Sequence, residues 1–325
     1  MITVAGLSKT YKVARRAAGL GQAARALFHR DYKVIEALKD VSFTINTGEI
    51  VGYIGPNGAG KSTTVKVLSG ILAPDDGECR VMGRVPWRER VEHVRNIGVV
   101  FGQRSQLWWD VPVIDSLELL RDIYKVSPRS YRNSLDLLTA ALDLQDLLNT
   151  PTRQLSLGQR MRCELAASLL HSPRLLFLDE PTIGLDAVSK NAVRRFIKTI
   201  NQDQGVTVIL TTHDMNDIEA LADRILLIGK GQILYDGDLP DLRSRFVTRK
   251  TVTVDFREHQ QPITIPGAEI LSWSAERASL SVDIQTVSVS EVIARLSAEL
   301  DLVDLAVDTP PVEEMVVNLY KEYRI

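Results

Sequence analysis

The sequence predicts an α/β fold with a parallel sheet for its first 240 residues and a smaller α+β domain for residues 241–325. Three observations carry this prediction. Strand and helix patterns alternate as far as about residue 238, which is typical of a sheet with helices on its faces. The runs LLFLDEP and VTVILTTHD are almost continuously apolar, like strands buried on both faces. A glycine-rich stretch, GPNGAGKST, joins the short apolar run EIVGYIG to a helical pattern.

Composition excludes several classes of protein. The chain has 325 residues, 45% hydrophobic and 25% charged, which excludes a largely disordered or collagen-like chain and suggests about two domains. A formal net charge of −2 offers no bulk basic surface, so no nucleic-acid partner is expected. Cys79 and Cys163 lie far apart, which argues against a disulfide framework or a zinc site. We find neither a signal peptide nor an apolar run long enough to span a bilayer, and therefore expect a cytoplasmic chain.

The N-terminal 45 residues predict two strands separated by an insertion. ITVAGLSKTY alternates and predicts the first strand, and VSFTI at 41–45 predicts the second. Residues 13–33, rich in alanine and basic side chains, interrupt the pattern. This insertion is interpreted either as a solvated segment, the favoured reading, or as a helix lying against a membrane or a partner.

The composition changes after residue 240. Residues 241–325 carry nine basic and 14 acidic residues, whereas the preceding part carries 30 basic and 27 acidic residues. KTVTVDF, ILSWS, ASLSVDI and DLAVD predict strands, and SEVIARLSAEL and VEEMVVNLYKEY predict amphipathic helices. The pattern is compatible with a ferredoxin-like α+β domain that starts near residue 241.

The stretch from Gly55 to Thr63 fits the phosphate-loop pattern G-x-x-x-x-G-K-[ST], in the strand–loop–helix context that the pattern requires. Its glycines allow backbone angles that turn successive amides toward one anion. Lys61 could reach the β- and γ-phosphates, and the Ser62 hydroxyl could ligate Mg²⁺. A plain glycine turn before a helix is the alternative.

Two predicted strands end in side chains that suit phosphate chemistry. Asp179 and Glu180 end the apolar run LLFLDE, and ligands of open α/β sheets collect at this end of the strands. Asp179 is expected to hold Mg²⁺ and Glu180 to act as general base toward the attacking water. His213 ends a second apolar strand and could contact the γ-phosphate, although a lone histidine is weak evidence.

Five motifs in order make the sequence resemble the ATP-binding subunit of an ABC transporter: GPNGAGKS, LSLGQ at 155–159, LLFLDEP, GLD at 184–186 and TTHD. The resemblance covers roughly residues 1–240 and is greatest to the subunits of ABC-2-type exporters. It implies a P-loop ABC ATPase domain, with a mixed sheet core and a helical subdomain at about 105–170.

The resemblance also implies roles for single residues. Catalytic roles fall to Glu180, His213 and Gln103, and Mg²⁺ contacts to Ser62, Gln103 and Asp179. Nucleotide contacts fall to Tyr11, Gly55, Asn57, Gly58, Ala59, Gly60, Lys61, Ser62, Thr63, Ser156, Gly158, Gln159 and Asp186. Tyr32 competes with Tyr11 for stacking on adenine, and Gln106 competes with Gln103. Leu157 stands where the family usually has glycine, and its β-carbon could crowd a nucleotide.

The implied function is that of an ATPase that binds ATP and Mg²⁺ and closes head to tail with a second copy. Permease subunits would hold it at the cytoplasmic face of the cell membrane, with Trp108 and Trp109 as candidate contacts. Packing inside the helical subdomain is the alternative for these two rings. A soluble ABC ATPase without a permease stays open as a second function. A polysaccharide exporter subunit is a third, although it would require an all-β C-terminal domain.

Overall fold

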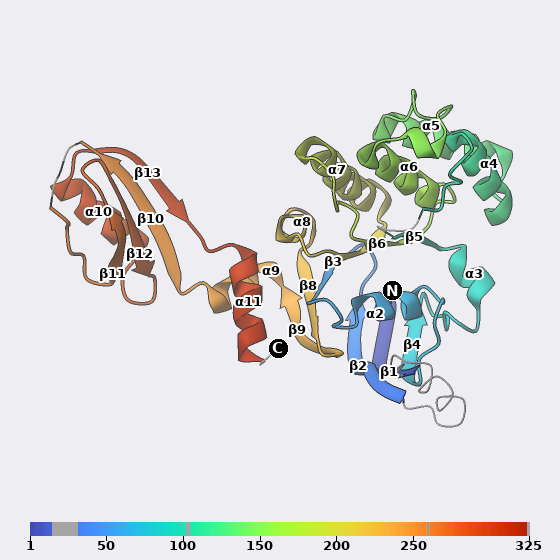
Figure 1. Cartoon of the computed structure of the whole chain (residues 1–325), viewed down its shortest axis with the longest axis horizontal. Helices are drawn as coiled ribbons and strands as arrows, with labels where there is room; N and C mark the ends of the chain where they lie inside the picture. The colour runs from blue at the N-terminus through green and yellow to red at the C-terminus, as the bar shows by residue number, and fades with distance from the viewer. Residues whose placement is uncertain (15–31, 102–104, 258, 260, 324–325) are drawn as a thin grey trace, which may run out of the picture. The chain divides into compact units, whose positions relative to one another are not determined.

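The computed structural model describes residues 1–14, 32–101, 105–257, 259 and 261–323 (Figure 1). The chain forms two compact units, Met1–Gly237 and Asp238–Ile325, which we call the N-terminal unit and the C-terminal unit. The α/β class predicted for the first part and the α+β class predicted for the second part are both confirmed. Each unit is described below by itself.

An antiparallel sheet in the order β2-β1-β4 opens the N-terminal unit. Its strands are β1 (Ile2–Ala14), β2 (Tyr32–Ile45) and β4 (Asp76–Val81). The predicted second strand, 41–45, is only the end of β2, because the alternating residues before it pair with β1 as far as Ala14 opposite Tyr32. Both edges of the predicted insertion are therefore strand, and residues 15–31 lie outside the described residues.

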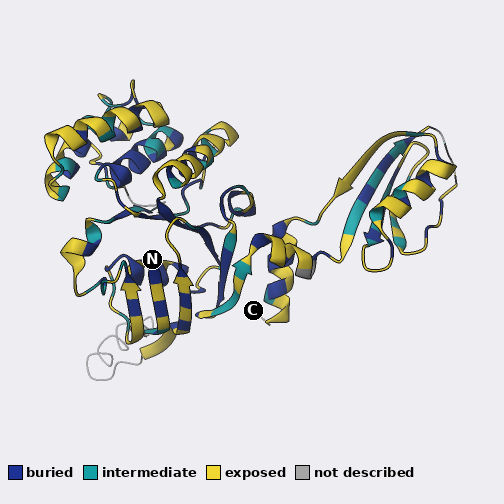
Figure 2. Cartoon of the chain, turned by 180° about the vertical axis from the view of Figure 1, so that it is seen from behind, coloured by how far each residue is buried: buried dark blue, intermediate teal, exposed yellow. Residues whose placement is uncertain are grey.

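The second sheet has six strands in the order β5-β6-β7-β3-β8-β9. The strands from β5 to β8 run parallel. Their bounds are β3 (Ile50–Ile54), β5 (Ile97–Phe101), β6 (Leu175–Asp179), β7 (Thr207–Thr211), β8 (Arg224–Gly229) and β9 (Gln232–Asp238). The central strands are buried, whereas the helices around them keep exposed faces (Figure 2). The near-continuous apolar runs in the sequence correspond to these buried strands.

Helix α2 (Lys61–Leu68) shares one apolar core with both sheets. The rings of Phe43 and Tyr53 lie 6.0 Å apart in this core. The Tyr53 hydroxyl lies 3.0 Å from the Thr64 hydroxyl of α2, which satisfies both buried groups. The N-terminal unit also contains α3 (Arg90–Val94), which contacts β5, α8 (Met215–Leu221), which contacts β3, and α7 (Ala187–Gln204).

Between β5 and β6 the chain forms a helical segment. It contains α4 (Val113–Tyr124), α5 (Pro128–Leu142), a short 3₁₀ turn (Thr152–Gln154) and α6 (Leu157–Leu169). Serine caps start two of these helices, Ser127 before α5 and Ser156 before α6, because their hydroxyls accept the first free N–H groups. Among the described residues, no helix combines the length and the apolar character needed to span a bilayer.

The C-terminal unit contains a four-stranded antiparallel sheet in the order β11-β12-β10-β13. Its strands are β10 (Arg249–Phe256), β11 (Ala268–Trp273), β12 (Arg277–Asp283) and β13 (Leu302–Asp308). Helix α10 (Val289–Glu299) packs on the sheet through Val292 and Leu296.

The sequence pattern suggested a ferredoxin-like order of elements in this unit. That suggestion is wrong. Helix α11 (Val312–Glu322) contacts α9 (Leu239–Phe246), so α10 is the helix that joins the core of the sheet. An amphipathic pattern shows that a helix has a buried face but not what covers it. The presence of α9, α10 and α11 also separates this unit from an all-β sandwich.

Candidate functional site

The loop between β3 and α2 carries the glycine-rich stretch. Helix α2 starts directly after Gly60, whose φ of 116° suits glycine alone. A Cβ atom at Gly60 would lie 2.5 Å from the carbonyl oxygen of Ala37, so a side chain would also clash there. Gly58, with φ of 81°, is left-handed as well. The loop therefore has the backbone form from which successive N–H groups can cradle an anion.

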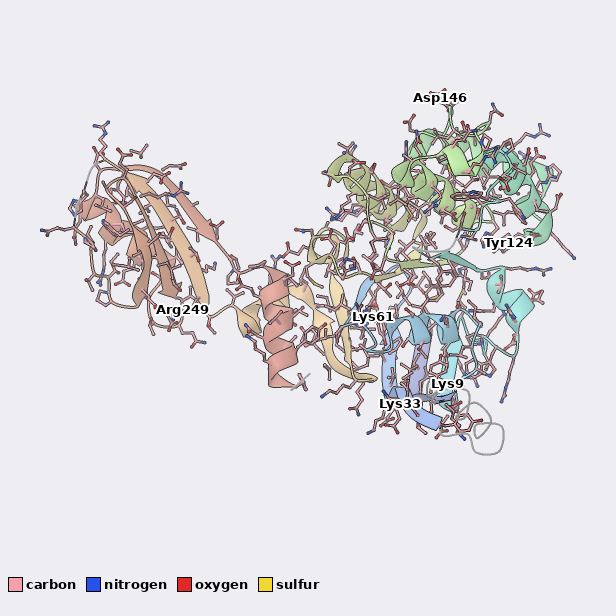
Figure 3. The ribbon with its side chains drawn as sticks, viewed as in Figure 1. Lys9, Lys33, Lys61, Tyr124, Asp146 and Arg249 are labelled. Carbon is pink, nitrogen blue, oxygen red and sulfur yellow. The ribbon has the colours of Figure 1, made fainter. Side chains whose placement is uncertain are left out.

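Lys61, the first residue of α2, lies in the wall of the same region (Figure 3). Its ammonium group donates hydrogen bonds to the carbonyl oxygens of Gly55, at 2.6 Å, and of Pro56, at 3.2 Å. Burial lowers the pKa of Lys61, and the nearby carboxylates of Glu180 and Asp179 oppose that shift. A largely buried cation thus faces the two predicted carboxylates.

The carboxylates lie where β6 and β7 end side by side. Asp179 pairs with Thr211 in the sheet, and the Thr211 hydroxyl donates a hydrogen bond to the Asp179 carboxylate. The Glu180 N–H donates to the Thr211 carbonyl oxygen at 2.8 Å, just beyond the sheet. Glu180 has a φ of 55°, a left-handed conformation that costs roughly 1 kcal/mol or more for a non-glycine residue. Such strained residues concentrate at functional sites.

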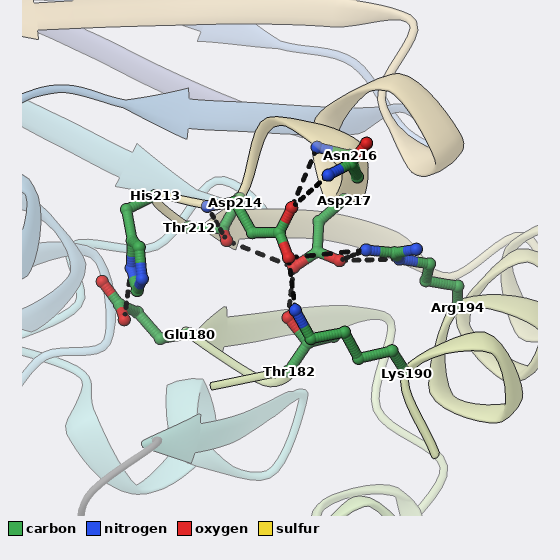
Figure 4. Close-up of polar contacts among 9 residues, drawn as sticks. All are labelled: Glu180, Thr182, Lys190, Arg194, Thr212, His213, Asp214, Asn216 and Asp217. Atoms are coloured by element: carbon green, nitrogen blue, oxygen red, sulfur yellow. Dashed lines mark hydrogen bonds and ion pairs between the residues drawn. The ribbon is translucent and has the colours of Figure 1, made fainter. Parts of the chain in front are cut away.

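His213 follows β7 and meets Glu180 directly. Its Nδ1 lies 2.8 Å from the Glu180 Oε2 (Figure 4). The imidazole is 64% exposed, whereas the Glu180 side chain is 25% exposed. This contact orients the glutamate and leaves the outer face of the imidazole open to solvent.

These groups border one cavity of about 760 Å³. Its volume lies within the range of pockets that hold small ligands. Nine predicted site residues line it: Asn57, Gly58, Gly60, Lys61, Ser62, Thr63, Asp179, Glu180 and His213. Ser62 and Asp179 bring hydroxyl and carboxylate oxygens to this space, which are ligand types suited to Mg²⁺. The donor set therefore fits a nucleotide with its metal ion.

Seven other predicted residues do not border this cavity. Ser156, Gly158, Gln159 and Asp186 do not line the cavity, and neither do Tyr11, Gly55 and Ala59. Gly55 contributes through its carbonyl, which holds Lys61. Gln103 lies outside the described residues, so its predicted role stays a prediction.

Several apolar residues outside the predicted site also line the cavity. Ile35 and Ala37 of β2, Ile71 after α2 and Phe101 at the end of β5 all line the cavity. Phe101 pairs with Asp179 in the sheet, so its place at the end of an apolar strand was a usable signal. Ile35 and Ala37 carry no motif, and only the pairing of β2 brings them here.

The register of the β1–β2 pair bears on the two candidate tyrosines. Tyr11 lies opposite Ile35, and directly opposed residues share a face of the sheet. Tyr32 lies three residues before Ile35, on the opposite face, and is 49% exposed. The register therefore favours Tyr11 over Tyr32, although the adenine-stacking role stays a prediction.

The LSLGQ stretch forms the start of α6. The Ser156 hydroxyl accepts from the Gln159 N–H at 3.2 Å, and the Gln159 Oε1 accepts from the Ser156 N–H at 2.9 Å, which is a capping box. A Cβ at Gly158 would lie 2.5 Å from the Ser189 hydroxyl oxygen. Asp186 caps α7 by accepting from the Ser189 N–H at 2.9 Å, and such bonds lower the pKa of Asp186. These two helix starts therefore lie against each other.

Leu157 takes part in the same contact. A Cβ at Gly184 would lie 2.8 Å from the Leu157 Cδ2, and Gly184 has a φ of 69°. The leucine thus packs against the loop that follows β6, while it remains 37% exposed. Its side chain has a packing partner within its own subunit.

Ser105 and Gln106 are tied to α6 by Glu164. This buried carboxylate accepts hydrogen bonds from the Ser105 hydroxyl and, at 3.0 Å, from the Gln106 N–H. The Gln106 side chain donates to the Val99 carbonyl oxygen at 2.6 Å. Both the backbone N–H and the side-chain amide of Gln106, the alternative glutamine, therefore already have hydrogen-bond partners.

A family model described as "ABC transporter" matches residues 38–183. The chain is 32% identical over 215 residues to the ABC transporter ATP-binding protein NatA of Bacillus subtilis, covering 66% of this chain and 87% of the relative. It is 31% identical over 290 residues to the linearmycin resistance ATP-binding protein LnrL of the same species, covering 87% and 93%.

Solved structures give the same picture. A dimeric post-hydrolysis state of the ATP-binding cassette MJ0796, bound to ADP and Pi, superposes with a TM-score of 0.61 at 26% identity. The superposition covers 74% of this chain and 99% of that cassette.

Proposed function

Because this chain belongs to the family of ABC transporter ATP-binding proteins, we propose that it powers an ABC-2-type exporter through separate permease subunits. The chain is an ATPase of this family. The observation that carries the proposal is the convergence of the phosphate loop, Asp179, Glu180 and His213 on one cavity. The relative named for linearmycin resistance supports the exporter assignment.

Within this proposal each group has a chemical role. The loop amides and Lys61 bind the phosphates, which keeps the γ-phosphate in line with a water molecule. Ser62 and Asp179 would hold Mg²⁺, which neutralises phosphate charge when bound. Glu180 accepts the proton of the attacking water, and His213 holds the glutamate in the orientation that this transfer needs.

A second copy would complete the site. The start of α6, with Ser156 and Gly158, carries N–H groups that have no partner in the preceding turn and a partial positive charge, and such helix starts bind phosphate. We place this start against the γ-phosphate held by the other subunit, with Asp186 at the same interface. ATP then joins the two copies, and hydrolysis removes the charge that holds them together.

Sedimentation velocity tests the dimer. The Glu180→Gln variant with MgATP is expected to sediment as a dimer, and adding Ser156→Arg is expected to abolish it. Ser127→Arg is the matched control, because the Ser127 hydroxyl also caps its helix by accepting from the N–H three residues on. Equal dimerisation in the Ser156 and Ser127 variants would contradict the head-to-tail arrangement.

Trp108 and Trp109 are the proposed permease contact, at the cytoplasmic face of the membrane. They are 45% and 52% exposed, and Arg160 of α6 lies 5.9 Å from the Trp109 ring. Exposed aromatic rings that adjoin a segment tied to α6 suit an interface rather than a core.

Copurification with membrane proteins encoded beside the gene tests this contact. We expect Trp108→Ala/Trp109→Ala to keep ATP affinity and the melting midpoint but to lose the membrane partner. Early melting would instead support the alternative, packing within the helical subdomain. A membrane partner that is never found would favour a soluble ABC ATPase.

A further inference from the structure

A buried carboxylate lies behind the Glu180–His213 pair. Asp217 of α8 is fully buried, and Arg194 of α7 donates to its Oδ1 from Nε at 2.7 Å and from Nη2 at 2.5 Å (Figure 4). A carboxylate without solvent stays charged only when such donors compensate it. Asp217 has no place in the motifs of the sequence or in the proposed chemistry.

The other oxygen of this carboxylate joins two loops. The Thr182 hydroxyl, in the loop after β6, donates to the Asp217 Oδ2. The Thr212 hydroxyl, in the loop after β7, donates to the same oxygen at 3.2 Å. Thr182 is two residues from Glu180, and Thr212 is adjacent to His213. One oxygen atom thus holds both loops near the groups that they carry.

A second ion pair supports the same loop from α7. Lys190 donates to the Asp214 carboxylate at 2.5 Å, and the Asn216 N–H donates to the other Asp214 oxygen at 3.0 Å. Asp214 follows His213, so the histidine is bracketed by two residues that are tied to fixed helices.

A small cavity lies between the two loops. Its volume is about 60 Å³, and it is lined by Glu180, Thr182, Ile183, Gly184, Lys190, Thr212, His213 and Asp214. The strand ends are already joined by the Glu180 N–H bond to the Thr211 carbonyl oxygen. Beyond that bond, the hydroxyl contacts to Asp217 link the two loops across this space.

We propose that Asp217 is a positioning residue for hydrolysis: held by Arg194, it ties Thr182 to Thr212 and so sets Glu180 and His213 at hydrogen-bonding distance. The inference rests on the proposed roles of Glu180 and His213. It predicts that loosening this tie lowers kcat while ATP binding, which uses the phosphate loop, is retained.

Thr182 provides the sharpest test, since its variants change one hydroxyl. Thr182→Val should lower kcat about 10-fold, and Asp217→Asn by on the order of 10- to 100-fold, because small displacements of catalytic groups cost this much. Thr182→Ser keeps the hydroxyl that donates to Asp217, so its kcat should be close to that of the unchanged protein. The Kd for ATP, measured by equilibrium binding, should stay within twofold in all three. Arg195→Ala, an exposed arginine beside Arg194, is the control that should change nothing.

The outcomes separate the two proposals. If Glu180→Gln keeps full turnover, the assignment of the base fails. If Glu180→Gln is inactive while Thr182→Val has normal kcat, only the positioning role fails. A loss that Thr182→Ser does not rescue, or a parallel loss of ATP affinity, would also overturn it. Should Asp217→Asn fail to fold, as judged by its melting curve, the valine and serine pair decides alone.

Discussion

The two units of the chain differ in whether they bury polar side chains. The N-terminal unit buries Asp217, Glu164 and Lys61, each with hydrogen-bond partners. Among the described residues of the C-terminal unit, every buried residue is apolar. Its ion pairs, such as Arg249 with Glu269, lie on the surface.

We relate this difference in buried polar groups to the place of the proposed reaction. Burying a polar group is unfavourable unless partners replace the lost water, so a fold that only needs to be stable gains most from an apolar core. The C-terminal unit follows that rule. The N-terminal unit departs from it beside the phosphate loop and the strand ends, where we place the reaction. Variants in the two units should therefore change different quantities.

The largest effect is expected for Glu180→Gln. The glutamine keeps the shape but cannot accept the proton, and general-base loss typically costs ~10²–10⁴ in rate. Steady-state ATPase assays should show this fall in kcat with ATP affinity retained. The matched control is Glu276→Gln, an exposed glutamate of the C-terminal unit. Normal turnover in Glu180→Gln would contradict the role of Glu180 as general base.

Leu280→Ala should act on stability instead. Leu280 is fully buried in the core of the C-terminal unit, and truncating such a leucine costs about 2–5 kcal/mol of the free energy of unfolding. Urea denaturation should show this loss, with an unchanged Kd for ATP. Arg295→Ala, which breaks only an exposed pair with Glu291, should cost under about 0.5 kcal/mol. A large fall in ATP affinity would mean that the units do not divide their tasks.

Lys61→Ala should weaken ATP binding by roughly 10- to 100-fold. A charge-assisted contact to phosphate contributes about 1.5–3 kcal/mol, and the alanine removes it. Fluorescent-nucleotide titration measures the change, with the exposed Lys198→Ala as control. Undiminished affinity would refute the assignment of the phosphate loop.

Leu157→Gly should have the smallest effect, about 1 kcal/mol of stability, since glycine disfavours helix and the contact with Gly184 is lost. Thermal melting would detect it, and Leu157→Met should melt normally. If the leucine instead crowds the nucleotide of a second copy, the glycine variant would dimerise more tightly with MgATP. No change in either measurement would contradict both explanations.

The sequence predicts best the features whose residues are contiguous in the chain. The phosphate loop and the carboxylates at 179–180 are contiguous, so their context could be read from one stretch. Asp217 lies in a helix whose sequence, MNDIEAL, suggests an exposed acid, and its partner Arg194 is distant in the chain. Ile35 reaches the cavity only through pairing of β2, and the partner of α11 was equally non-local.

The capping box at the start of α6 has a consequence for hydrogen placement. The Ser156 oxygen already accepts from Gln159, so its lone pairs are partly engaged by the helix itself. The hydroxyl hydrogen is then the part of that side chain left to donate to a ligand. Gln159 in turn occupies the Ser156 N–H. An incoming oxyanion would therefore meet a hydroxyl that can donate at a helix start, whereas a ligand that must itself donate would compete with Gln159 for the Ser156 oxygen.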